Sequence, residues 1–395
     1  MVRAIATLPA VIGSWGHPGG GLLLSTSAHF KFNRAALLRP DLQAKPHDIS
    51  EVHWHREIPR TVNMNQIGDA LISLQDPPIM SMFVFNSNPA AVAPDSTKVR
   101  AGLTRDDLLL IVHEQMMTDT ANLADIVLPA TSQLECLDIM RSYGHLYANL
   151  CTPAIPPLGE SRANIDVQNA LAHAMGFTDS AFDQGAEEVI RAALDSDSPL
   201  MNGVTYERLQ AEGFVHLNTS AQPWIPYGAG HDFATASGKV ELYSSKAEAD
   251  GYDPLPDYYH PTESLYGSPE LAQRYPINLL SPAAHHFLNS TFANIEGLQK
   301  SEKEPRIWLN PDDCEQRHIV DGMKVRVWND RGEVTLTAVV SDRVRPGVAW
   351  SPSLWWQRDS HDNANVNVLT SQRVTDMGGG STFHTNLVQV EGLTA

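Results

Sequence analysis

Residues 83–135, FVFNSNPAAVAPDSTKVRAGLTRDDLLLIVHEQMMTDTANLADIVLPATSQLE, decide how this chain folds. In and just before this stretch, three largely apolar runs at 81–86, 108–113 and 125–128 predict strands. Continuous apolar runs are typical of parallel strands that are covered on both faces. A polar loop and a helical segment separate the strands, at the spacing of βαβ units. Polar residues follow the strands at their carboxyl ends, where doubly wound sheets hold phosphate-bearing ligands.

The composition limits the classes of protein that the chain can belong to. Its 395 residues are enough for two or three domains, and 42% apolar with 19% charged residues is ordinary for a globular protein. A net charge of −18 argues against nucleic acid or an anionic membrane as a partner. No run of about 18 apolar residues predicts a membrane-spanning helix. The first residues make a poor signal peptide, so a cytoplasmic location is the default expectation.

The cysteine content argues against a disulfide scaffold and against an iron–sulfur cluster. The three cysteines, Cys136, Cys151 and Cys314, form no CxxC pair. An iron–sulfur cluster needs about four thiolates, so we expect none in this chain. We expect the three thiols to be structural.

The remaining pattern divides the chain into three parts. We predict a partial α/β domain over 1–200, an irregular connector over 201–275 with a short strand at 239–243, and a β-barrel domain over 276–395. Helical spacing predicts helices at 64–74, 164–175 and 184–194. From residue 276 the runs INLLS, RIWLN, KVRVWN, EVTLTAVV, GVAWSPS and LVQVEG predict six strands of a closed barrel. Turn residues 329–332 predict a hairpin between the third and fourth of these strands.

Several motifs in this order resemble those of one enzyme family. They are GSWGHPGGG at 13–21, NSNPA at 86–90, the run 111–135, SPAAHHFLNSTFAN at 281–294, the run 310–348 and the run 363–391. Together they resemble the molybdopterin oxidoreductases of the dimethyl sulfoxide reductase and formate dehydrogenase type. The resemblance extends over nearly the whole chain but only over the C-terminal half of a typical member. The cysteine motif and the metal-ligand segment of such a member have no counterpart here.

The resemblance implies a fold, a cofactor and a function. The fold is an α/β class with an incomplete doubly wound parallel sheet and a C-terminal six-stranded barrel. The cofactor is molybdopterin guanine dinucleotide with molybdenum or tungsten, used for oxygen-atom or hydride and electron transfer to a small-molecule substrate. A missing N-terminal half or a partner chain would supply the iron–sulfur cluster. The alternatives are a non-catalytic cofactor-binding remnant or subunit, and an unrelated acidic α/β protein whose motifs are all structural.

Candidate cofactor-binding residues in the first part follow the predicted strands. The resemblance assigns Asn86, Ser87 and Asn88 to a pterin or phosphate edge, although such residues also cap turns. His113 and Glu114 end the next strand, where ribose or guanine contacts are expected, or only a structural hydrogen bond. A further two candidates, Thr118 and Asp119, start a short helix with Thr118 as N-cap, and that N-terminus could face an anion.

The barrel domain supplies the other candidates. The resemblance assigns Ser281, His285, His286 and Asn289 to the pterin and diphosphate. A metal site is not expected here, because adjacent histidines do not have metal-ligand spacing. Either the barrel core or a stacking role suits Trp355 and Trp356. The remaining candidates are the pterin-edge amides Asn365 and Asn367, with Phe383 and His384 after a glycine-rich turn that lets the backbone approach a ligand. No metal ligand and no catalytic residue are predicted.

Overall fold

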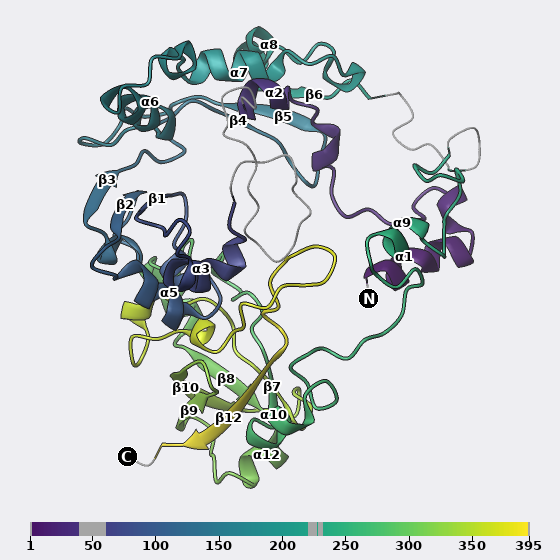
Figure 1. The fold of residues 1–395 in the computed structure, drawn as a ribbon, viewed down its shortest axis with the longest axis vertical. Coiled ribbons are helices and arrows are strands. Elements are labelled where there is room, and N and C mark those ends of the chain that lie inside the picture. Colours follow the sequence, from purple (N-terminus) through teal and green to yellow (C-terminus); the bar gives the residue numbers. More distant parts are fainter. Residues whose placement is uncertain (1, 39–60, 220–226, 228–231, 394–395) are drawn as a thin grey trace. The chain divides into compact units, whose positions relative to one another are not determined.

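The structure, a computed structural model, describes residues 2–38, 61–219, 227 and 232–393, and it divides into two compact units (Figure 1). One unit consists of Met1–Asp41 and Thr131–Tyr259, and the other consists of Leu42–Ala130 and His260–Ala395. These units cut the chain differently from the predicted division at 200 and 275, which stays a prediction. The difference is visible at β5 (Tyr147–Cys151), which pairs with β6 (Phe214–His216) across the boundary predicted at 200.

The first unit packs helices on a small antiparallel sheet. Its strand order is β4–β5–β6, with β4 formed by Asp138–Met140. Its helices are α1 (Val2–Val11), α2 (Arg34–Leu38), α6 (Asn164–Ala174), α7 (Ala186–Leu194), α8 (Tyr206–Glu212) and α9 (Ser245–Ala249). The core contains Leu150, Ile190, Leu209 and Val215. The predicted helices at 164–175 and 184–194 are confirmed.

The strand predicted at 239–243 is wrong. The described residues there form bends and turns instead. Phe233 donates its N–H to the carbonyl of Gly238, and the Thr235 hydroxyl donates to the carbonyl of Lys239. The backbone groups are therefore used in a local turn rather than in a ladder with another strand.

The second unit contains the predicted parallel sheet. Strands β1 (Ser81–Phe85), β2 (Leu109–Glu114) and β3 (Ile126–Pro129) pair in this order, so that Phe85 lies opposite His113 and His113 opposite Leu128. Helices α3 (Ile67–Ser73), α4 (Pro89–Val92) and α5 (Ser96–Leu103) accompany the sheet. Their apolar side chains and those of the strands form one core that includes Leu71, Val84, Val99, Leu110 and Val112. The βαβ pattern read from residues 81–128 is confirmed.

The helix predicted to start at Thr118 is only a single 3₁₀ turn, Ala121–Leu123. The Thr118 hydroxyl accepts a hydrogen bond of 3.2 Å from the N–H of Ala121, but the N-cap of that turn is Thr120 and not Thr118. The rest of the connection between β2 and β3 consists of bends, a turn and irregular chain.

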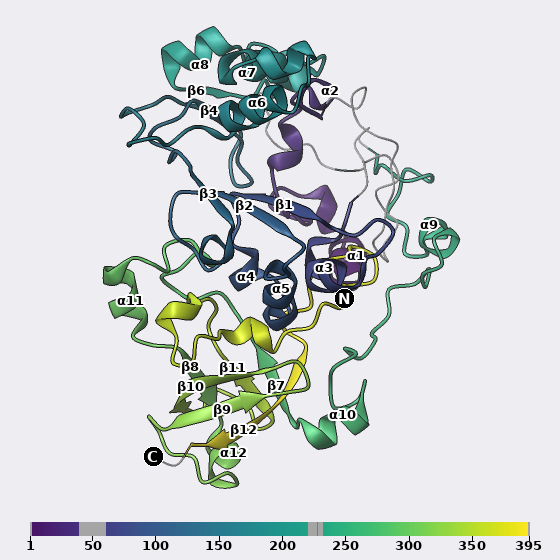
Figure 2. The ribbon, with the colours of Figure 1, turned by 60° about the vertical axis from the view of Figure 1, so that its left-hand side comes forward.

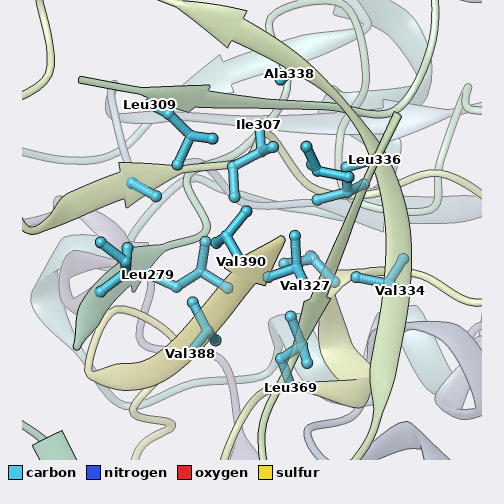
Figure 3. Packing of buried hydrophobic residues seen from close by; sticks show 14 of the residues in the cluster. Leu279, Ile307, Leu309, Val327, Val334, Leu336, Ala338, Leu369, Val388 and Val390 are labelled. Carbon is cyan, nitrogen blue, oxygen red and sulfur yellow. The ribbon is translucent and has the colours of Figure 1, made fainter. Parts of the chain in front are cut away.

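The barrel is closed and has six strands, as predicted. Their order around the barrel is β10–β8–β11–β7–β12–β9. They are β7 (Ile277–Leu280), β8 (Arg306–Leu309), β9 (Lys324–Trp328), β10 (Glu333–Val340), β11 (Val348–Trp350) and β12 (Asn386–Gly392). Every second residue points into the barrel, where Leu279, Ile307, Val327, Leu336 and Val388 meet (Figure 3). All six strands contribute to this core, and the core residues of one strand are two positions apart, as the period of a strand requires.

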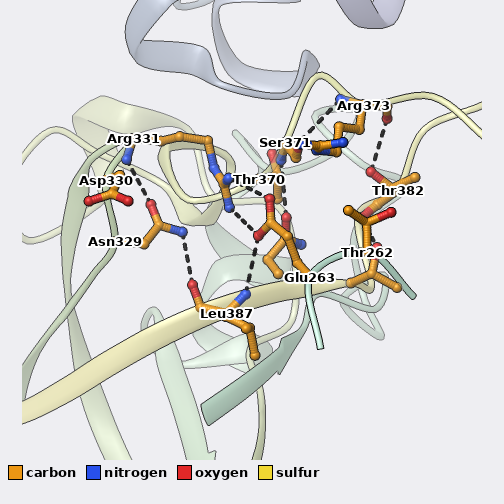
Figure 4. Close-up of polar contacts among 12 residues, drawn as sticks. Thr262, Glu263, Asn329, Asp330, Arg331, Thr370, Ser371, Arg373, Thr382 and Leu387 are labelled. Carbon is orange, nitrogen blue, oxygen red and sulfur yellow. Dashed lines mark hydrogen bonds and ion pairs between the residues drawn. The ribbon is translucent and has the colours of Figure 1, made fainter. Parts of the chain in front are cut away.

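Three helices surround the barrel, and a polar clamp holds the segment that precedes it. The helices are α10 (Pro269–Arg274), α11 (Glu296–Glu302) and α12 (Pro311–Glu315). Arg331, in the β9–β10 turn, forms two parallel bonds of 2.7 and 2.9 Å with the buried carboxylate of Glu263 (Figure 4). The same guanidinium donates to the carbonyl of Leu369, and the Asn329 amide joins the carbonyls of Leu369 and Leu387. The connector is therefore fixed to the barrel at Glu263.

Candidate functional site

A buried polar seam joins the parallel sheet to the barrel within the second unit, where α4 and α5 lie between them (Figure 2). At its centre, the side-chain oxygen of Asn88 accepts bonds of 3.0 and 2.8 Å from the N–H and hydroxyl of Thr120. The Thr120 hydroxyl in turn accepts from the N–H of Ala90, in the first turn of α4. Asn88 thus ties the end of β1 to the loop that follows β2.

Asp119 connects the loop after β2 to the barrel domain. Its Oδ1 accepts a 3.1 Å bond from the N–H of Gln357, and its Oδ2 lies 3.5 Å from the amide nitrogen of Asn88. The Gln357 side chain donates to the carbonyl of Ala90. Burial raises the pKa of the Asp119 carboxyl, because its hydrogen bonds and the nearby arginine charges only partly offset its lost hydration.

Asn365 and Asn367 complete the seam. Their amide nitrogens donate to the carbonyl of Ala91 at 3.3 and 2.9 Å, and Asn367 also donates to the carbonyl of Val92. These carbonyls end the short helix α4 and would otherwise lack partners. Asn88, Asp119, Asn365 and Asn367 therefore have partners within the chain, and their assignment as cofactor ligands stays a prediction.

A cleft of about 780 Å³ opens beside this seam at the carboxyl end of β1. It brings together six of the predicted residues, which come from the loop after β1, the loop after β7, the 3₁₀ turn Val366–Val368 and the glycine-rich turn. They are Ser87, Ser281, Asn289, Asn367, Phe383 and His384. Phe83 and Phe85 of β1 add aromatic surface. None of the described residues that line the cleft is Lys or Arg.

Three of these side chains have polar atoms without partners among the described residues. The hydroxyl of Ser87, the amide of Asn289 and the imidazole of His384 form no hydrogen bond to another described residue, whereas Ser281 donates to the carbonyl of Phe383 at 2.9 Å. Asn289 also adopts a left-handed backbone with φ of 53°. Such a conformation is uncommon for residues other than glycine and often accompanies a binding site. The cleft therefore offers neutral donors and acceptors to a ligand.

The tryptophans lie outside the cleft, in a core of their own. Trp355 and Trp356 are 8% and 3% exposed and pack with Phe287, whose ring meets Trp355 edge-on at 5.1 Å. The Trp356 indole donates to the carbonyl of Ser290 at 2.8 Å. Of the two alternatives in the sequence, core packing is what the structure contains, although the core is not that of the barrel. Little indole surface remains for stacking on a ligand.

The two histidines after β7 also lie outside the cleft. The imidazole of His286 lies 2.9 Å from Oε1 of the buried Glu302 carboxylate. The backbone N–H of His286 donates to the same oxygen. His285 meets the ring of His286 edge-on. This arrangement holds the 281–289 loop against α11.

His113 and Glu114 end β2 beside the strand that carries the cleft. His113 is 1% exposed, and its Nε2 has no partner among the described residues. Burial raises the pKa of the half-buried Glu114 carboxyl. Neither residue lines the cleft, nor do Asn86 and Thr118, so the predicted contacts of these four residues with the cofactor stay predictions.

Sequence reasoning missed one wall of the cleft. Val62, Met64, Asn65 and Ile67 line it, although we predicted this stretch only as the start of a helix. The available signal was the Asn63-Met-Asn motif at a helix start, which indicates a cap and nothing more. Among the described residues, no cluster of three or more His, Cys, Asp or Glu side chains could hold a metal ion, and no helix is long and apolar enough to cross a membrane.

Comparison with known proteins identifies the class to which this fold and cleft belong. Residues 1–174 match the family described as molybdopterin oxidoreductase, and residues 277–387 match the molydopterin dinucleotide binding domain. The chain belongs to the molybdopterin oxidoreductase family, as its motifs predicted.

Individual relatives support this membership. The chain is 42% identical over 393 residues to the probable oxidoreductase YoaE of Bacillus subtilis, with 99% of this chain and 54% of YoaE covered. It is 30% identical to the dimethyl sulfoxide reductase DmsA of Haemophilus influenzae, with 99% and 52% covered. Acetylene hydratase from Pelobacter acetylenicus has the same fold, with a TM-score of 0.68 at 23% identity over 93% of this chain and 50% of the hydratase. The chain thus spans about half the length of the curated relatives that it matches.

The cofactor implied by the family is a molybdopterin dinucleotide with molybdenum or tungsten. The cleft fits its uncharged heterocycles, because the hydroxyl, amide and imidazole groups without partners suit ring edges and the phenylalanines suit ring faces. A diphosphate would meet no Lys or Arg among the described lining residues. Backbone N–H groups and hydroxyls would have to bind it.

Proposed function

We propose that this chain forms part of the cofactor cradle of a molybdenum or tungsten oxidoreductase that uses molybdopterin guanine dinucleotide. The reaction class is oxygen-atom transfer, or hydride and electron transfer, to a small molecule. The observation that carries the proposal is the cleft at the carboxyl end of β1, where Ser87, Asn289 and His384 present polar groups without partners among the described residues. This is the edge at which α/β sheets bind ligands.

The proposed roles of the residues follow from their chemistry. When bound, the cofactor supplies the redox centre, and the protein binds and orients it. Asn289 offers both a donor and an acceptor to a ring edge, while Ser87 offers a hydroxyl and His384 an imidazole from other segments of the lining. Phe83, Phe85 and Phe383 exclude water from the ring faces.

In a second proposal, the chain binds the same cofactor in the same cleft but does not catalyse a reaction by itself. In it the chain is a cofactor-binding subunit or remnant, and a partner chain supplies the iron–sulfur cluster and the metal ligand. Both proposals predict bound cofactor. They differ in whether the isolated chain reduces a sulfoxide, the substrate class named for the relatives DmsA and biotin sulfoxide reductase. A cytoplasmic location belongs to both proposals, and cell fractionation tests it.

The experiment uses a matched pair of asparagines. Asn289 and Asn363 both have left-handed backbones, with φ of 53° and 57°, but only Asn289 lines the cleft. Replacement by glycine tolerates that backbone and removes the amide. In cells that make the cofactor, Asn289→Gly should lower the GMP and molybdenum bound per chain about tenfold, the effect of losing about 1.4 kcal/mol of binding energy. Asn363→Gly should leave both unchanged, and an equal effect of the two substitutions would contradict the assignment of Asn289.

A further inference from the structure

One backbone carbonyl beside the cleft accepts two side-chain amides from a distant segment. The carbonyl of Gly379 accepts bonds of 2.9 Å from Asn63 and 3.2 Å from Asn65. The amide of Asn65 also donates to the side-chain oxygen of Asn63 at 3.1 Å. We call this set of three bonds the asparagine clasp. It joins positions that are 316 and 314 residues apart in the sequence.

The clasp holds the tip of a loop that is otherwise closed on itself. Within this glycine loop, residues 375–384, Thr375 donates its N–H to the carbonyl of Gly380 and accepts from the N–H groups of Gly379 and Gly380. Gly379 has φ of 59°, which glycine adopts without strain. Its carbonyl is used by the clasp rather than by the loop.

The two ends of the glycine loop are fixed independently of the clasp. Gln372 accepts from the N–H of Asp69 at 3.0 Å and donates to Asp95, which anchors the start of the loop. At the other end, the carbonyl of Phe383 accepts from the Ser281 hydroxyl and the Asn386 amide. Loss of the clasp should therefore free the loop tip without unfolding the domain.

The residues on both sides of the clasp line the cleft. Met64, Asn65 and Ile67 come from the segment that contains Asn63, and Gly380, Ser381 and His384 come from the glycine loop. A ligand that contacts both segments binds more tightly when both are already ordered. Ordering a loop during binding costs entropy, and this cost lowers the affinity.

We propose that Asn63 and Asn65 are positioning residues that set the width of the cleft through Gly379 and so control how tightly the cofactor is held. This inference rests on the proposed function of the cleft. Asn63, which does not line the cleft, acts on the ligand through the glycine loop, whereas Asn65 both lines the cleft and holds the loop.

The test removes the side-chain N–H donor of Asn63 and keeps its side-chain oxygen, which has a second role. Asn63 also caps the adjacent 3₁₀ turn, because its oxygen accepts from the N–H of Asn65. Asn63→Asp retains that oxygen but places a second oxygen against the carbonyl of Gly379. The matched control is Asn33→Asp in the first unit, where the side-chain oxygen likewise accepts a helix N–H, from Ala36, and the charge change is the same. Asn65→Ala, which leaves the cap of Asn63 in place, is a second variant in case Asn63→Asp folds poorly.

Two readouts are combined with thermal melting as a check of folding. Hydrogen exchange of amides 376–381 reports the loop tip, and loss of GMP and molybdenum during dialysis of protein loaded in cells reports retention of the cofactor. In Asn63→Asp, both rates should rise about tenfold, equivalent to about 1.4 kcal/mol, with Tm unchanged. Asn33→Asp should change neither rate.

Each contrary result identifies what has failed. Unchanged exchange at 376–381 would overturn the clasp, and faster exchange with unchanged retention of GMP would overturn its role in holding the cofactor. A wild-type protein that carries no GMP would overturn the proposed function itself, and with it the positioning role.

Discussion

The side-chain oxygen of Asp119 and the backbone N–H of Gln357, 238 residues apart in the sequence, are joined by a hydrogen bond of 3.1 Å. This bond links the loop after β2 to the loop after β11. Asp119 is only 6% exposed, and burial disfavours the charged form of its carboxyl.

Asp119 should therefore make stability depend on pH. Burial raises the pKa of its carboxyl above the unfolded value of about 3.9. Between those two pKa values the folded state binds more protons than the unfolded state, so this residue's contribution falls as pH rises. Asp119→Asn keeps the acceptor for Gln357 and removes the charge. We expect the Tm of this variant to gain on wild type as pH rises from 4 to 7, and a constant difference in Tm would contradict the assignment.

Removing the acceptor altogether should destabilise the protein, in contrast to Asp119→Asn. Asp119→Ala leaves the N–H of Gln357 unsatisfied, which costs about 1–3 kcal/mol for a buried group. Urea unfolding at pH 7 should give a lower free energy of unfolding for Asp119→Ala than for Asp119→Asn. Equal values would mean that the bond does not contribute to joining the sheet and the barrel.

The Glu263–Arg331 clamp should be required for stability. The Glu263 and Arg331 side chains are 7% and 20% exposed, and removal of one partner from such a buried pair costs about 3–5 kcal/mol. Glu263→Ala should thus lower the free energy of unfolding by an amount in that range. Glu296→Ala is the matched control, because its pair with Lys300 is exposed on both sides and should contribute little. Similar losses in the two variants would show that burial is not what gives the clamp its strength.

The barrel core should respond to the loss of single side chains. Leu279 is fully buried among the inward-facing residues of the barrel. Leu279→Ala should cost about 2–5 kcal/mol, as is usual when a large side chain leaves a cavity. Leu280, the next residue, is only partly buried and is not part of this cluster, so Leu280→Ala should cost less by urea unfolding. A larger loss for Leu280→Ala would contradict the inward orientation of alternate residues.

The fold was predictable where local sequence determines structure. The strands at 81–85, 109–114 and 324–340 follow from apolar runs and from the turn at 329–332, which depend on neighbouring residues. The run 239–243 has a strand-like composition, but a strand needs a partner with free ladder groups, and Gly238 instead closes a turn with Phe233. Pairing partners are a property of the tertiary structure.

The candidate site was predictable only in part for a similar reason. Ser87, Asn289 and His384 reach the cleft, but Asn365 and Asn367 look the same in sequence and instead bind the carbonyls of Ala91 and Val92. Their partners lie about 275 residues away, as the separation between Asn367 and Val92 shows. Which asparagine faces a ligand and which one faces the chain is decided by such distant contacts.

The central claim is that the cleft beside β1 holds a molybdopterin guanine dinucleotide, and cofactor content tests it most directly. The chain would be purified from cells in which cofactor synthesis is active, and GMP released by acid would be measured together with molybdenum and tungsten. We predict GMP in stoichiometric amounts with the metal. A well-folded protein with neither GMP nor metal would contradict the account.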